Sequence, residues 1–87
     1  MATVFIPSMM RELTGGRDTI EIPGSTVRRI VRAMEEAYPG TSGWLLDGDR
    51  LKPNISVAID GNVDPLGLLA EVGEDSEVHF LAAIAGG

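Results

Sequence analysis

The 87-residue chain contains no cysteine, and this absence excludes several kinds of chemistry at once. Without a thiol there is no disulfide, no thiolate metal site and no cysteine nucleophile. The single histidine, His79, has no second His or Cys with which to share a metal, and Asp47-Gly48-Asp49 lacks the remaining ligands of a calcium loop. We therefore expect no metal site, and we interpret His79 as a surface residue of a strand.

Long hydrophobic runs are also missing. No apolar stretch reaches the roughly 18 residues of a membrane-spanning helix. The first residues do not combine a basic segment with an apolar segment, as a secretory signal does. We expect a cytoplasmic protein with no membrane partner, folded as one domain over residues 1–87 around a modest core.

Positive charge is absent from the second part of the chain. Residues 53–87 contain no Lys or Arg, so the formal net charge of −6 arises entirely there. The acids of this segment are Asp60, Asp64, Glu71, Glu74, Asp75 and Glu77. Binding to nucleic acid requires clustered Lys and Arg, so we expect no nucleic-acid partner. Two interpretations remain open: the acids steer a basic partner protein to the end of the chain, or they form a solvated surface that keeps a small domain soluble.

Four short segments have the composition or the alternation of β-strands. They are residues 3–6, 18–22, 54–59 and 77–81. Asp60-Gly61 is a strong signal for a tight hairpin, and Asn62-Val63 begins the return strand. Residues 9–13 are expected to contain a short helical turn, and residues 65–72 either a helical turn or an irregular packed stretch.

One amphipathic helix is expected after Pro23-Gly24. Ser25 or Thr26 is a suitable N-cap, and Pro39-Gly40 ends the helix. Its apolar stripe consists of Val27, Ile30, Val31, Met34 and Tyr38. We interpret the arginines of the opposite face as solvated rather than as a binding patch. Trp44, in the turn-rich segment that follows, is expected to anchor the core or its edge.

The order of these elements predicts the fold class. A single helix must cover one face of a mixed sheet. If strand 18–22 is the hairpin partner of strand 3–6, strand 77–81 can lie beside the first strand and parallel to it. We therefore predict an α+β fold of the β-grasp type: a mixed sheet of four to five strands, one main helix packed on one face, and a projecting C-terminal tail.

Alternation in the last strand separates its side chains into two sets. Val78 and Phe80 would face the helix, whereas His79 and Leu81 would lie on the open face of the sheet. Phe5 or Pro7 of the first strand could join them there. We interpret this surface as a docking site for a partner protein; the alternative is that a small sheet leaves a few apolar groups exposed.

The last seven residues are small and apolar, and they end in Gly86-Gly87. No other part of the sequence has the pattern of an active site, which leaves the carboxylate of Gly87 as the reactive group. As an acyl-adenylate, this carboxylate can be attacked by a sulfur donor, and residues without a Cβ atom pass through a narrow channel. We expect a carrier rather than an enzyme, with Ala85 and Gly86 threaded into a partner and Ile84 docked beside Phe5 and Leu81.

These features resemble the MoaD/ThiS family of ubiquitin-like sulfur carriers over nearly the whole chain. The shared segments are Arg11-Glu12-Leu13-Thr14-Gly15, Ser25-Thr26-Val27, Glu74-Asp75-Ser76-Glu77-Val78 and the Ala-Gly-Gly end. Ile6-Pro7-Ser8, Thr14-Gly15-Gly16 and the final five residues look most like the CysO-type carriers of cysteine biosynthesis. Many small subunits of molybdopterin synthases have prolines before the tail, where this chain has Ala82-Ala83.

The resemblance implies a β-grasp fold and a division of labour with partner enzymes. An adenylating enzyme of the MoeB/ThiF kind would use ATP to activate Gly87, the carboxylate would become a thiocarboxylate, and a sulfur-accepting synthase would receive the sulfur. The chain itself would bind no cofactor, and Leu81 matches an apolar docking position. Three other functions remain open: a molybdopterin synthase small subunit, a ubiquitin-like modifier conjugated through Gly87, and an interaction module without chemistry.

Overall fold

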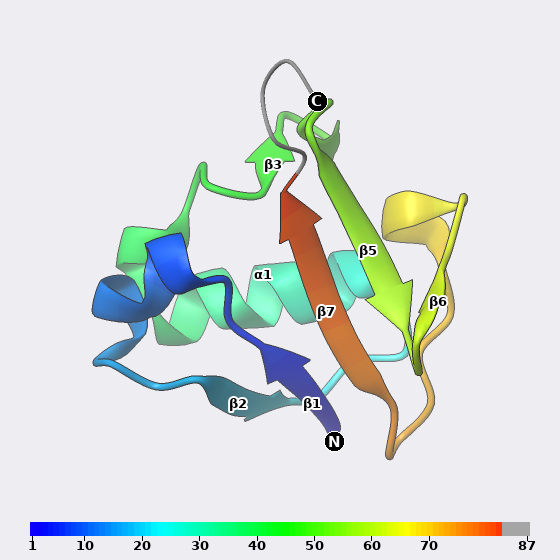
Figure 1. The fold of residues 1–87 in the computed structure, drawn as a ribbon, viewed down its shortest axis with the longest axis horizontal. Helices are drawn as coiled ribbons and strands as arrows, with labels where there is room; N and C mark the ends of the chain where they lie inside the picture. The colour runs from blue at the N-terminus through cyan, green and yellow to red at the C-terminus, as the bar shows by residue number, and fades with distance from the viewer. Residues whose placement is uncertain (83–87) are drawn as a thin grey trace.

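Strand β7 (Glu77–Ala82) lies at the centre of a five-stranded mixed sheet, and the other elements are arranged around it (Figure 1). The computed structural model describes residues 1–82. The strand order is β2-β1-β7-β5-β6, in which β1 spans Ala2–Phe5, β2 Thr19–Ile22, β5 Ile55–Ile59 and β6 Asn62–Val63. β1 and β7 run parallel, and the other neighbours run antiparallel. The predicted strands and the parallel pairing of first and last strand are confirmed.

Helix α1 (Val27–Ala37) crosses one face of the sheet and lies behind it in Figure 1. The hydroxyl of Thr26, the N-cap, accepts a hydrogen bond from the N–H of Arg29 at 3.3 Å. The helix ends at Ala37, because Tyr38 precedes a proline and takes an extended φ of −133°. Tyr38, expected in the apolar stripe, therefore caps the helix and is half-buried against the core.

Short elements fill the connections between the strands. The 3₁₀ helices η1 (Ser8–Thr14) and η3 (Gly67–Leu69) confirm the two predicted helical turns, and η2 (Pro39–Thr41) follows α1. A small hairpin of β3 (Leu46–Asp47) and β4 (Arg50–Leu51) was not predicted. Asp47-Gly48-Asp49 supplies its turn, with Gly48 at a φ of +67°. Within residues 1–82, no helix is long and apolar enough to cross a membrane.

The β5–β6 hairpin forms as its sequence predicts. Asp60 and Gly61 have φ values of +51° and +87°, and both are positive, as a type I′ turn requires. This turn pairs Ile59 with Asn62 and Ala58 with Val63. Its geometry therefore fixes which side chains of β6 share a face with β5.

The core lies between α1 and the helix-facing side of the sheet, and it corrects the prediction for Trp44. Trp44 is 39% exposed, whereas the neighbouring Leu45 is fully buried. The backbone N–H of Trp44 donates to the carbonyl of Thr41 in the turn. The Leu45 carbonyl accepts the backbone N–H of Lys52 just before β3 begins. Trp44 lies in the turn that follows η2, and of the two side chains only that of Leu45 enters the core. Leu45 takes the place predicted for Trp44.

Candidate functional site

Strand β7 carries the chain from the centre of the sheet toward the predicted working end. Its last residue, Ala82, pairs with Ile55 of β5. Gly87, the threading residues Ala85 and Gly86, and the docking residue Ile84 all lie outside the described residues. The structure therefore bears on the predicted site through the strand that leads to it and through the surface beside that strand.

Side chains of β7 alternate between the two faces of the sheet as predicted. Val78 and Phe80 are buried in the core. Leu81 is 45% exposed on the opposite face, and the side chain of His79 is 37% exposed there. The centre of the sheet therefore presents apolar side chains on a face that α1 does not cover.

A row of side chains crosses this open face from strand to strand. Phe5 is paired with His79, His79 with Ala58, and Ala58 with Val63. The rings of Phe5 and His79 are stacked, with centroids 4.0 Å apart and an interplanar angle of 11°. We call Phe5, His79, Leu81, Ala58 and Val63 the open-face row. The structure thus places the predicted docking residues Phe5 and Leu81 on one surface.

Val63 is a member of this row that the sequence prediction missed. Val63 is 62% exposed, compared with 45% for Leu81. The signal was present: a two-residue turn at Asp60-Gly61 forces Val63 opposite Ala58. Because Ala58 pairs with His79, the hairpin places Val63 on the face of His79. The row therefore extends over β1, β7, β5 and β6.

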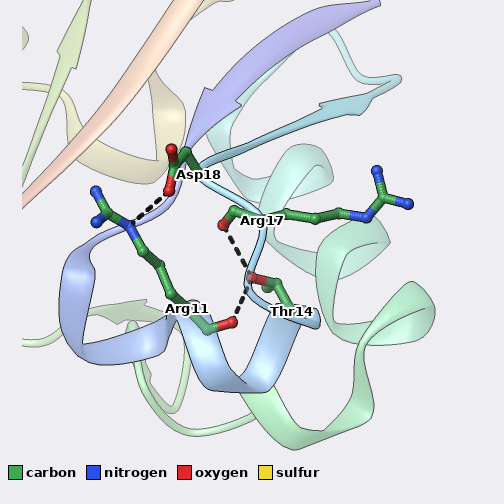
Figure 2. A network of polar contacts seen from close by, with 4 residues as sticks. All are labelled: Arg11, Thr14, Arg17 and Asp18. Carbon is green, nitrogen blue, oxygen red and sulfur yellow. Dashed lines mark hydrogen bonds and ion pairs between the residues drawn. The ribbon is translucent and has the colours of Figure 1, made fainter.

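The Arg11–Thr14 motif, which carries part of the family resemblance, builds the turn between η1 and β2 (Figure 2). The buried Thr14 hydroxyl lies 3.1 Å from the Arg11 carbonyl oxygen and 3.3 Å from that of Arg17, so it can donate to either. Gly15 and Gly16 follow with φ values of +68° and +81°, a region that favours glycine. The motif fixes the path of the chain between its first two strands.

The Arg11 side chain lies beside the open-face row. Its Nε atom is 3.2 Å from the Asp18 carboxylate (Figure 2). Both residues border a hollow of about 630 Å³. Phe5, Pro7 and His79 form the apolar wall of this hollow. A partner that covers the open-face row would therefore also meet an arginine and an aromatic stack near the end of β1.

The acidic residues lie at the other end of β7. Glu74 and Asp75 directly precede the strand, and the Asp60 carboxylate accepts the N–H of Glu77, its first residue, at 2.9 Å. The two ends of β7, Glu77 and Ala82, lie roughly 16 Å apart. The tail itself lies outside the described residues, so the interpretation that the acids steer a basic partner to it stays a prediction.

Catalytic chemistry has no evident centre in the part of the chain that the structure describes. Residues 1–82 contain no group of three or more His, Cys, Asp or Glu side chains that could hold a metal ion. The nearest acid to His79 is Glu77, with Nε2 and Oε1 3.8 Å apart on the surface. What the described residues offer is an exposed, partly apolar sheet face beside the strand that precedes the final residues.

A mixed five-stranded sheet crossed by one helix, with parallel first and last strands, defines a ubiquitin-like β-grasp protein. The model of the ThiS family matches residues 4–87, and the chain belongs to this family. The sulfur carrier protein CysO of Mycobacterium tuberculosis and that of Mycobacterium bovis are each 28% identical to it over 90 residues. Each alignment covers 98% of this chain and 97% of the relative.

Solved structures agree with the family match. A chain of the Amycolatopsis orientalis BexX/CysO complex is 32% identical, with full coverage of both chains and a TM-score of 0.91. Mycobacterium tuberculosis CysO is 25% identical over 97% of this chain and all of its own, with a TM-score of 0.87. The small archaeal modifier protein 1 of Methanosarcina acetivorans (22% identity, TM-score 0.81, 99% and 95% coverage) shares the fold. The β-grasp prediction and the resemblance to CysO-type members of the MoaD/ThiS family are confirmed.

Proposed function

We propose that the protein is a sulfur carrier that holds sulfur as a thiocarboxylate on Gly87. The observation that carries the proposal is the ThiS family match, which runs through Gly86 and Gly87 to residue 87. The CysO relatives, described as sulfur carrier proteins, align over almost their whole length and support it. The protein itself acts as a co-substrate, and enzymes that bind it perform the chemistry.

The proposed reaction has two steps. The Gly87 carboxylate attacks the α-phosphorus of ATP, and pyrophosphate leaves, which converts a poor electrophile into an acyl-adenylate. A sulfide sulfur then attacks the carbonyl carbon, and the C–O bond to AMP breaks with its electron pair leaving on AMP. The product is a thiocarboxylate. ATP is bound and consumed by an adenylating enzyme of the MoeB/ThiF kind, so the carrier needs no cofactor of its own, and the proposal puts it in the cytoplasm.

Recognition by these partners would use the open-face row. An adenylating enzyme that covers Phe5 and Leu81 would remove exposed apolar surface from water while β7 directs the final residues toward the enzyme. For the acceptor we favour a synthase of cysteine biosynthesis, because the relatives are of the CysO type. A molybdopterin synthase is the alternative acceptor.

Intact-mass measurement tests the proposal. The protein is incubated with ATP, sulfide and an adenylating enzyme that has been shown to activate a CysO relative. We expect a mass gain equal to the exchange of one oxygen for one sulfur, and no gain in a variant that lacks Gly86 and Gly87. An unchanged mass would overturn the proposal. Adducts linked through Gly87 to lysines of other proteins would instead identify a ubiquitin-like modifier.

A further inference from the structure

Strand β2 forms one edge of the sheet, with its outer side unpaired within residues 1–82. The Ile6 N–H donates to the Asp18 carbonyl at 2.8 Å, which identifies residues 6 and 18 as a hydrogen-bonded antiparallel pair. Such pairs alternate with pairs that do not exchange hydrogen bonds. In the observed register, Ile20 and Ile22 therefore bond toward β1. The N–H and C=O groups of Thr19 and Glu21 point away from the sheet.

A hollow of about 680 Å³ follows this free edge. The four residues of β2 line one side, Ala37 and Tyr38 at the end of α1 line another, and Arg17 lies at the start of the strand. An added strand lies about 4.8 Å from its neighbour in a sheet, and the hollow lies beside the unpaired edge where such a strand would be placed. Natural edges are usually protected by proline, lysine or a bulge. Residues 19–22 contain neither proline nor lysine, and their regular register with β1 leaves no bulge. The protection of this edge therefore consists of its short length of four residues, the exposed Glu21 and the proline that follows at position 23.

The residues at this edge carry one basic side chain, Arg17, and two acidic ones, Asp18 and Glu21. Asp18 is already paired with Arg11, whereas the guanidinium of Arg17 points away from that pair (Figure 2). No carboxylate of residues 1–82 lies within ion-pair distance of Arg17. Glu21 is exposed between the buried Ile20 and Ile22, so its side chain faces the open side of the sheet. An acidic side chain at the start of β2 would therefore find an arginine without a competitor.

We propose that the free edge of β2 is a second docking site, which adds an extended acidic segment of a partner protein to the sheet. The backbone of the segment bonds to Thr19 and Glu21, its apolar side chains cover Tyr38 and Ala37, and its acid pairs with Arg17. Antiparallel pairing is the better geometry, and it puts the acid at the C-terminal end of the segment. This site adjoins the open-face row at Thr19, which pairs with Phe5, but it uses the backbone edge of β2 rather than the face of the sheet, and it does not depend on sulfur chemistry at Gly87.

A synthetic peptide tests this site by NMR titration of the ¹⁵N-labelled full chain. The probe is an acetylated, amidated hexapeptide of alternating valine and threonine that ends in glutamate. We expect amide shifts at Arg17, Thr19 and Glu21, and a dissociation constant on the order of 10⁻⁴ M, because only two edge residues offer backbone bonds. The same peptide with its glutamate at the first position should bind severalfold more weakly.

One pair of protein variants and one pair of N-methylated peptides distinguish strand addition from nonspecific binding. Arg17→Glu should weaken binding about tenfold by exchanging attraction for repulsion, whereas Arg29→Glu on the exposed side of α1 should leave it unchanged. N-methylation of the peptide amides that face β2 should abolish binding, and N-methylation of the alternate amides should not. Equal binding by both methylated peptides, shifts confined to the open-face row, or no shifts at millimolar peptide would overturn the proposal.

Discussion

Neighbouring residues of β7 belong to two surfaces that do different work. Val78 and Phe80 are buried between the sheet and α1, whereas His79 and Leu81 lie on the face that no helix covers. Burial makes the first pair responsible for stability, and exposure makes the second pair available to a partner. Substitutions one residue apart should therefore separate folding from recognition, and this separation is open to direct test.

The largest effect is expected at Phe80. Phe80→Ala empties a buried site in the core, and such changes lower the free energy of unfolding by about 3–5 kcal/mol. Leu81→Ala on the open face should change it by less than about 1 kcal/mol. Urea unfolding followed by circular dichroism measures both. Similar losses for the two variants would show that the open face contributes to the core.

The same comparison applies at Trp44 and Leu45, beyond the sheet. Leu45→Ala should lower the free energy of unfolding by about 2–5 kcal/mol, because Leu45 is fully buried. Trp44→Ala should cost much less, even though it removes the larger side chain, because Trp44 remains partly in water. Chemical denaturation ranks the two variants. A larger loss of stability for Trp44→Ala than for Leu45→Ala would show that Trp44 anchors the core, as the sequence predicted.

The sequence predicted those parts of the fold in which local chemistry and packing agree. Thr26, Pro39 and the spacing of apolar residues define α1, and Asp60-Gly61 defines its hairpin, because caps, prolines and positive φ values act within a few residues. Alternation in β7 likewise identified Phe80 as buried and Leu81 as exposed. These predictions required no knowledge of distant contacts.

Other features depend on the direction that the chain takes in three dimensions. Trp44 outweighs Leu45 in apolar surface, yet the turn after η2 and the bond between Leu45 and Lys52 decide which side chain enters the core. The place of Val63 in the open-face row follows only from the hairpin register together with the pairing of β5 with β7. The acids before Glu77 are close to Ala82 in sequence, yet β7 places them at its opposite end.

Within the open face, Leu81→Asp should impair recognition and leave folding intact. A carboxylate in the open-face row must lose its water when a partner covers it, so we expect formation of the thiocarboxylate to slow at least tenfold at limiting partner concentration. Leu69→Asp is the matched control, since Leu69 is 67% exposed in η3 and lies outside the row. Rates come from the intact-mass assay. Equal rates for the two variants would show that the partner does not dock on the open-face row.

The smallest effect is expected at the acidic end of β7. Glu74→Gln with Asp75→Asn removes two charges at the end of β7 opposite Ala82. If these acids steer a basic partner, the association rate should fall a few-fold at low salt and the difference should vanish at high salt, where exposed charges are screened. Stopped-flow association at two ionic strengths measures this. A salt-independent loss would mean that the partner touches both ends of β7, and recognition would then extend along the whole open face rather than concentrate at the row.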